Sequence, residues 1–113
     1  MNSRSLGQAG ELLAIKFLQQ HGYRIIQQNF KTRFGEIDII ARHRRQLVFI
    51  EVKTRSSVEF GHPEEAVTEK KLLHLKRCAQ VYLLQKRLDC TCRFEVLSVQ
   101  WGSPPACKLL PLD

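Results

Sequence analysis

Apolar residues recur along this chain at two different spacings, one typical of helices and one of strands. Near the N-terminus they return every three or four residues, and the capping-box pattern S-x-x-Q begins at Ser5. Gly22 supplies a stop signal, so we expect a helix from Leu6 to His21. The same spacing resumes after Thr68, a favourable N-cap, and predicts a second helix that ends near Arg87.

The strand-like segments are short, rich in Ile, Val and Phe, and bounded by polar turns. Because a helix separates the third segment from the fourth, we expect those two strands to be parallel neighbours joined by a right-handed crossover. Pro63 and the two glutamates after it favour a helical turn ahead of the second helix. The predicted strands are Tyr23–Phe30, Glu36–Ala41, Leu47–Lys53 and Arg93–Gln100, with a short edge strand near Lys108–Leu110.

These elements predict an α/β fold with the order αβββαβ, in which helices flank a mixed central sheet. A chain of 113 residues is long enough for one core, so we expect a single domain over residues 1–113. Its formal charge of +7 and pI near 9.6 favour a polyanionic partner, nucleic acid first and an anionic membrane surface second. No apolar run approaches the ~18 residues of a membrane span, and no signal peptide is visible, which predicts a cytoplasmic protein.

The cysteines raise the question of zinc or disulfides. Cys90 and Cys92 are separated by one residue, whereas common zinc sites use C-x₂₋₄-C. Without a secretory signal the thiols are expected to stay reduced. We therefore interpret Cys78, Cys90, Cys92 and Cys107 as ordinary buried or half-buried thiols.

Charged residues interrupt the two apolar strands on either side of the turn Arg42–Gln46. If the turn is centred between Arg44 and Arg45, Asp38 lies opposite Glu51, and Glu36 lies opposite Lys53. Opposed side chains in such a pair have Cβ atoms roughly 4.5–5.5 Å apart, where two carboxylates repel. A shared proton could offset that repulsion, but a divalent cation such as Mg²⁺ fits better, with Lys53 beside a bound water or phosphate.

A purely structural interpretation of these residues stays open. In it, Glu36 and Lys53 form an ordinary cross-strand salt bridge on a half-exposed sheet. Glu11 also allows two interpretations. It lies at the margin of the buried stripe of the first helix and could reach the sheet, or it is a first-turn glutamate stabilised by the helix dipole.

Many short blocks of this chain occur in the same order in a known group of proteins. The blocks are Gly10-Glu11, Gly22-Tyr23, Asn29-Phe30, Gly35–Asp38, Phe49–Arg55, Phe60-Gly61, Pro63–Thr68 and Lys71. On these blocks the chain resembles the small bacterial YraN family of endonuclease-like proteins and, more broadly, the PD-(D/E)xK nucleases with Holliday-junction-resolvase-like domains. In place of the proline before Asp38 this chain has Ile37, and where the family has Arg-Phe-Asp it has Arg93-Phe94-Glu95, which weakens any metal role there.

The resemblance implies a restriction-endonuclease-like core and an Mg²⁺- or Mn²⁺-dependent endonuclease. Asp38 and Glu51 would be the metal ligands, Lys53 would orient the attacking water, and Glu11 would complete the acidic cluster. We expect a hydrolase acting on DNA, branched or damaged DNA included. Two alternatives remain, a binding module without turnover and an RNA-processing nuclease. Whether the protein is a monomer or a homodimer does not follow from the sequence. Candidate nucleic-acid contacts are Thr54, Arg55, Arg44, Arg45, Lys70 and Lys71.

Overall fold

The structure, a computed structural model, describes residues 3–56 and 68–112. The predicted αβββαβ order is confirmed, followed by one more strand at the C-terminal edge. Within the described residues the strands form a five-stranded sheet in the order β1-β2-β3-β4-β5. β3 and β4 are parallel, as the intervening helix predicted, and the other neighbours are antiparallel. The elements are α1 Ser3–Gln20, β1 Arg24–Thr32, β2 Gly35–His43, β3 Gln46–Arg55, α2 Glu69–Lys86, β4 Cys92–Gln100 and β5 Ala106–Leu112.

The helix ends follow local sequence signals, with one exception. α1 already begins at Ser3, so Ser5 lies inside its first turn and the predicted cap at Ser5 is wrong. Gly22 ends α1 as predicted, with a φ of 84°. Thr68 caps α2 through a 3.2 Å bond that its hydroxyl accepts from the Lys71 N–H. The helical turn predicted at Pro63, and the rest of the loop that contains it, lie outside the described residues.

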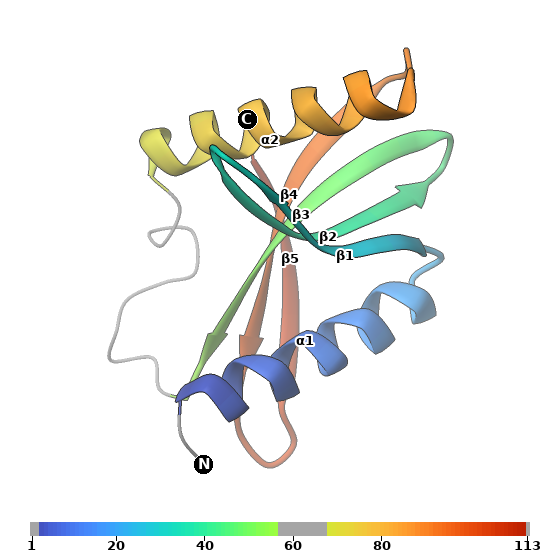
Figure 1. Ribbon diagram of the computed structural model, residues 1–113. Coiled ribbons are helices and arrows are strands. Elements are labelled where there is room, and N and C mark those ends of the chain that lie inside the picture. The colour runs from blue at the N-terminus through green and yellow to red at the C-terminus, as the bar shows by residue number, and fades with distance from the viewer. Residues whose placement is uncertain (1–2, 57–67, 113) are drawn as a thin grey trace.

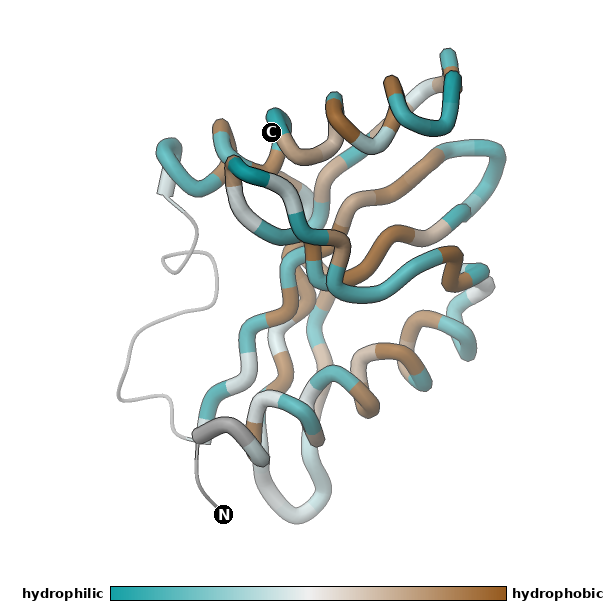
Figure 2. Tube along the Cα trace, in the orientation of Figure 1, coloured by the Kyte–Doolittle hydropathy of each residue, from teal (hydrophilic) through white to brown (hydrophobic). Residues whose placement is uncertain are grey.

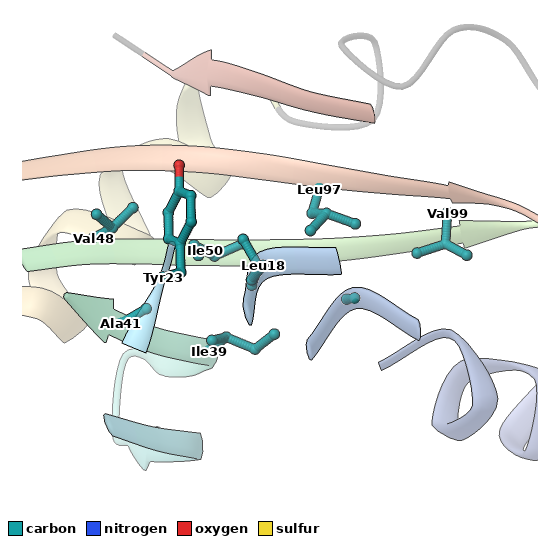
Figure 3. Close-up of a cluster of buried hydrophobic side chains, with 9 residues drawn as sticks. Leu18, Tyr23, Ile39, Ala41, Val48, Ile50, Leu97 and Val99 are labelled. Atoms are coloured by element: carbon teal, nitrogen blue, oxygen red, sulfur yellow. The ribbon is translucent and has the colours of Figure 1, made fainter. Parts of the chain in front are cut away.

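α1 and α2 cover opposite faces of the sheet (Figure 1). On the α1 face, Ala14 and Leu18 pack against Ile39, Ile50 and Leu97 in a fully buried cluster (Figure 3). Leu75, Cys78, Ala79 and Tyr82 form the buried stripe of α2, and they pack against the other face. Both faces are therefore apolar along the middle of the central strands, and the hydrophilic positions gather toward their ends (Figure 2).

The hairpin of β2 and β3 turns where the charge pattern predicted. His43 pairs with Gln46, and Arg44 and Arg45 both have positive φ, 50° and 69°. These are the dihedrals of a type I′ turn, which matches the twist of the flanking strands. Ile40 pairs with Phe49, so the predicted register is confirmed in this part of the hairpin.

The ladder between β2 and β3 ends at Ile39 and Ile50, before it reaches the predicted acid pair. Between Gly35 and Ile37, β2 pairs with β1 alone, and the turn between these two strands lies beneath the start of α2 (Figure 1). The end of β3 runs instead toward the start of α1 (Figure 1). Asn29, in β1 opposite this point, has a φ of 52°. The two central strands thus separate at a fork, and Asp38 lies at its base.

Side-chain alternation in β2 breaks at the same place. Ile37 and Ile40 both belong to the cluster under α2, whereas Ile39 belongs to the cluster under α1. A regular strand would place Ile37 and Ile39 on one face. The irregularity moves Asp38 off the face that it was predicted to share with Ile40, and this changes the geometry of the acidic site. Within the described residues, neither helix has the length and apolar character needed to cross a bilayer.

Candidate functional site

Close contact between α1 and β3 brings Glu11 to the sheet. A Cβ atom at Gly10 would lie 1.9 Å from the Oγ1 atom of Thr54, so no larger residue fits there without movement. Gly7, one turn earlier, has no such neighbour within 4 Å. Because Glu11 follows Gly10, its carboxylate is held near the fork, which agrees with the first of its two interpretations.

Asn29 joins Glu11 to Glu36. With its amide nitrogen turned toward the acids, Asn29 donates to Glu36 Oε1 at 3.0 Å and to Glu11 Oε1 at 3.1 Å. This orientation is assigned because the opposite one would place the amide oxygen against acceptors. Burial raises the pKa of Glu11, and the nearby charges of Glu36 and Glu51 raise it further. Carboxylates from α1 and β2 are therefore held together by a neutral donor from β1.

Asp38 is the most perturbed acid of the site. Burial and then the charge of Glu51 raise its pKa from 3.8 to about 7. The carboxylate accepts a 2.7 Å bond from the Val52 N–H, which opposes this shift without cancelling it. Glu11 and Glu36 add smaller repulsions. The fork thus concentrates negative charge that its own hydrogen bonds do not offset.

Lys53 pairs with Glu51 rather than with Glu36. Its Nζ atom lies 3.2 Å from Glu51 Oε1, and both side chains are partly buried. The predicted cross-strand pair of Glu36 and Lys53 is wrong, because β2 no longer pairs with β3 at Glu36. The ladder partner of Glu36 is instead Lys31 of β1. Burial alone would lower the pKa of Lys53, but contacts with Lys71 and Glu51 outweigh burial and raise it. Lys53 therefore keeps its charge.

Lys71, in the first turn of α2, brings a second ammonium group to the site. A hydrogen bond from the Lys53 ammonium, and then the charge of that group, lower the pKa of Lys71. The charge of Arg55 lowers it further. Cations from the end of β3 and the start of α2 thus stand beside the acids of the fork.

A cleft lies on each side of the fork. The α2-side cleft, of about 140 Å³, is lined by residues that include Glu36, Glu51 and Lys71. The α1-side cleft, of about 390 Å³, is lined by residues that include Glu11 and Asp38. Asp38 and Glu51 were predicted to face each other on one surface of the sheet, but they line clefts on different sides. Their charges still interact strongly, since Glu51 follows burial as the largest cause of the raised pKa of Asp38.

A family model described as uncharacterised protein family UPF0102 matches residues 10–99. The chain belongs to this family. A UPF0102 protein of Caldicellulosiruptor saccharolyticus is 48% identical over 88% of this chain and 85% of its own length. One of Chlorobium phaeobacteroides is 50% identical over 83% and 75%, and one of Geobacter metallireducens is 42% identical over 98% and 93%. This confirms the resemblance to the YraN family, but the names of these relatives state no activity.

The UPF0102 match contains every acid and lysine of the fork, from Glu11 to Lys71. The other predicted nucleic-acid contacts are placed differently. Thr54 packs against Gly10, and Lys70 is exposed on α2. Arg44 and Arg45 form the tip of the hairpin, which extends away from the fork (Figure 1). The structure therefore brings Lys71 to the acids, places Arg55 near Lys71, and leaves the hairpin arginines apart from them.

Glu95 takes no part in the fork of this UPF0102 protein. It is buried in β4 and accepts a 2.8 Å bond from the hydroxyl of Tyr23, and its other oxygen lies 3.6 Å from Arg93. Arg93 also donates to the same hydroxyl and contacts His43, whose ring stacks on Tyr23. This network ties Tyr23, the residue before β1, to β2 and β4, which agrees with the weakened expectation of a metal role at Glu95.

Sequence reasoning missed Asn29, Phe34 and His74 as residues near the acids. Asn29 carried a usable signal, since asparagine tolerates positive φ better than most residues. Phe34 and His74 carried none. The two line the α2-side cleft together only because the β1–β2 turn packs under α2.

Proposed function

We propose that this UPF0102 protein is a metal-dependent hydrolase of phosphodiester bonds in DNA. The observation that carries the proposal is the fork, where the charges of Glu11, Glu36 and Glu51 all act on the partly buried Asp38 and where Lys53 pairs with Glu51. Partly buried like charges are costly, and their retention at one place usually marks a functional site. The net charge of +7 supports a polyanionic substrate, because it is achieved despite these acids.

The donor set suits Mg²⁺ or Mn²⁺. Carboxylate oxygens are hard ligands, and a divalent cation would offset the repulsion that raises the pKa of Asp38. Among the described residues, no three His, Cys, Asp or Glu side chains are grouped closely enough to hold a metal by themselves. Mg²⁺ commonly takes one or two carboxylates and completes its shell with waters and substrate phosphates. Asp38 and Glu51 line different clefts but interact through their charges, so a cation at the fork would take one or both of them. When bound, such a cation polarises the scissile phosphate and lowers the pKa of a bound water.

The chain's own residues supply position and charge around that reaction. Lys53 stays protonated, and its ammonium group would stabilise negative charge on the phosphate in the transition state. The Val52 N–H holds the Asp38 carboxyl group in position. Because the pKa of Asp38 is about 7, this carboxyl group would have to lose its proton before it could bind a metal ion. Glu11 and Asn29 hold the α1 side of the cluster in place. Arg55 and Lys71 would contact phosphates that flank the scissile bond.

Cleavage of defined substrates tests the proposal. Wild-type protein is incubated with single-stranded, duplex and branched DNA, and with the matching RNA strands, in Mn²⁺, Mg²⁺ or EDTA. We expect metal-dependent cleavage of at least one DNA substrate, with none by Lys53→Ala. Preferential cleavage of the RNA strands would favour the RNA-processing alternative. Binding without cleavage of any strand would contradict the hydrolase.

One contact favours a second candidate, a DNA-binding module that has kept the fold without turnover. Glu51 already pairs with Lys53 at 3.2 Å, so the negative charge of this proposed metal ligand is partly neutralised by the protein itself. Metal binding would have to compete with that pair. In this alternative the salt bridge persists in the DNA complex, and divalent cations leave the stability of the protein unchanged.

A further inference from the structure

The α2-side cleft contains more than the acids of the proposed hydrolase. Its buried floor is formed by Leu75 and Cys78 of α2, and the ring of Phe34 forms one wall. His74 and Lys71 stand on successive turns of α2 at its polar rim. At about 140 Å³ the cleft is smaller than the ~300 Å³ at which pockets for drug-sized ligands begin. Its size suits a single ring system better than a whole nucleotide or a peptide.

Phe34 is held firmly in place by its turn. The hydroxyl of Thr32 accepts a 3.0 Å bond from the Phe34 N–H and donates to the Gly35 carbonyl at 3.2 Å. The same hydroxyl lies 3.2 Å from the Cys78 sulfur on α2. One side chain therefore braces the turn and anchors it to the helix on the other side of the cleft, so the aromatic wall and the floor form a preorganised unit.

Cations surround that wall. The guanidinium of Arg33 lies 4.8 Å from the centroid of the Phe34 ring, and that of Arg77 lies 5.8 Å from it. Lys71 also lines the cleft, where its charge interacts with that of Glu51. Apart from the charged groups of Glu36, Glu51 and Lys71 and the ring of His74, the lining is apolar. A phosphate would be attracted to the cations and repelled by the two carboxylates, whereas a neutral heterocycle fits beside Phe34 and Leu75.

We propose that the α2-side cleft binds one unstacked base of a DNA strand whose phosphates contact Arg33, Arg77 and Lys71. This inference rests on the proposed function, because Glu51, one of the proposed metal ligands, also lines the cleft and so places the bound base next to the catalytic acids. A base inside a duplex cannot enter, so the cleft selects nucleotides that are unpaired, as in single strands, branch points or damaged sites. Stacking on Phe34 is tolerant of base identity, because every base has an aromatic face.

Binding in EDTA tests this site without any hydrolysis. Fluorescence anisotropy gives the affinity for a short single strand and for a strand of the same length that carries abasic sites throughout. Loss of a stacked base costs roughly fivefold to a hundredfold in affinity, so wild-type protein should prefer the intact strand by at least fivefold. Phe34→Leu should lower the affinity for the intact strand to that for the abasic strand and leave the latter unchanged. Phe17→Leu, an aromatic change on α1, should preserve the preference.

A second variant protects the test against misfolding. His74 is half-buried on α2, and His74→Trp would fill the cleft from the helix without replacing any residue of the turn. It should abolish the preference as Phe34→Leu does. Equal wild-type affinity for both strands, or a preference that survives both variants, would overturn the base site. A preference without metal-dependent cleavage in the separate assay would overturn the hydrolase and leave the base site standing.

Discussion

Replacing Asp38 by asparagine should make the metal-free protein more stable at alkaline pH. Burial and the charge of Glu51 raise the pKa of Asp38 from 3.8 to about 7. The folded protein therefore holds this proton to a higher pH than the unfolded chain does, and ionisation of Asp38 destabilises the fold. The amide oxygen of the substituted side chain would still accept the Val52 N–H, so Asp38→Asn removes the charge and preserves the contact.

The size and the pH window of the effect follow from the shift. One pKa unit corresponds to 1.36 kcal/mol, so a shift from 3.8 to about 7 costs roughly 4 kcal/mol once the carboxyl is fully ionised. The cost is absent below pH ~4, grows as the pH rises, and is complete above pH ~7. Between pH 5 and pH 8 the wild type should lose about 2–3 kcal/mol relative to Asp38→Asn, or ~10 °C in Tm. Because the charges of Asp38 and Glu51 interact, this difference in unfolding free energy reflects the ionisation of the pair and not of Asp38 alone.

Urea unfolding in EDTA at pH 5, 6.5 and 8 measures this difference. The stability advantage of Asp38→Asn should increase with pH and be largest at pH 8. The exposed Asp89 offers a matched control, since Asp89→Asn removes the same charge outside the fork. That variant should follow the wild type at every pH. Groups outside the fork are the same in the two proteins, so their titration cancels in the comparison.

Divalent cations should reverse the order of stability at pH 8. A ligand of the folded state stabilises it by mass action, so Mn²⁺ should raise the Tm of the wild type and leave that of Asp38→Asn nearly unchanged. At pH 5 protons compete for the same oxygens, and the gain in the wild type should shrink. A constant difference between the two proteins from pH 5 to pH 8 would refute a buried, crowded Asp38. Equal metal-induced shifts in both would remove Asp38 from the metal site.

Further predictions concern the lysine, the helix contact and the hairpin tip. Lys53→Ala should abolish cleavage but preserve stabilisation by Mn²⁺, measured as a Tm shift, because a charged lysine cannot be a ligand. Gly10→Ala should cost roughly 1–3 kcal/mol in urea unfolding, and adding Thr54→Gly should restore most of it because the 1.9 Å clash disappears. Replacing Arg44-Arg45 by Asn-Gly should lower the slope of log K against log salt by up to about two, with saturated cleavage unchanged. An unchanged slope would make the tip a mere solvated turn.

The Asn-Gly replacement matters because of the backbone at the tip. Arg44 and Arg45 have positive φ, which arginine adopts only at some cost. Alanine there would lose the charges and keep the strain, whereas Asn-Gly is the preferred type I′ turn. A change in binding could then be assigned to the lost charges and not to a distorted hairpin.

Elements with strong local signals were predictable from the sequence. Thr68 and Gly22 marked a helix start and a helix end, and the Arg44-Arg45 turn set the register of Ile40 with Phe49. These features depend on hydrogen bonds and dihedrals within a few residues, so neighbouring sequence is sufficient to specify them. The parallel pairing of β3 with β4 was also predictable, because chain connectivity restricts how a helical crossover can return.

The geometry of the acids was not predictable in the same way. Extending the register from Ile39 and Ile50 by one pair placed Asp38 opposite Glu51, and by three pairs placed Glu36 opposite Lys53. The strands instead separate there, because β2 stays with β1 through the irregularity at Asn29 while β3 follows α1. That choice depends on packing of both helices, including the contact of Gly10 with Thr54, which no local pattern encodes.

Burial of a charge alone does not identify a functional site in this protein, as Glu95 shows. Glu95 is 8% exposed, yet Tyr23 donates to one of its oxygens at 2.8 Å and Arg93 lies 3.6 Å from the other. Its charge is offset within the fold, so it needs no ligand. Asp38 is less deeply buried but stands among acids, and one N–H bond leaves its pKa near 7. Of these two carboxylates, Asp38 is therefore the one at which a bound cation would change the stability of the whole protein, and the pH dependence of Asp38→Asn measures that difference directly.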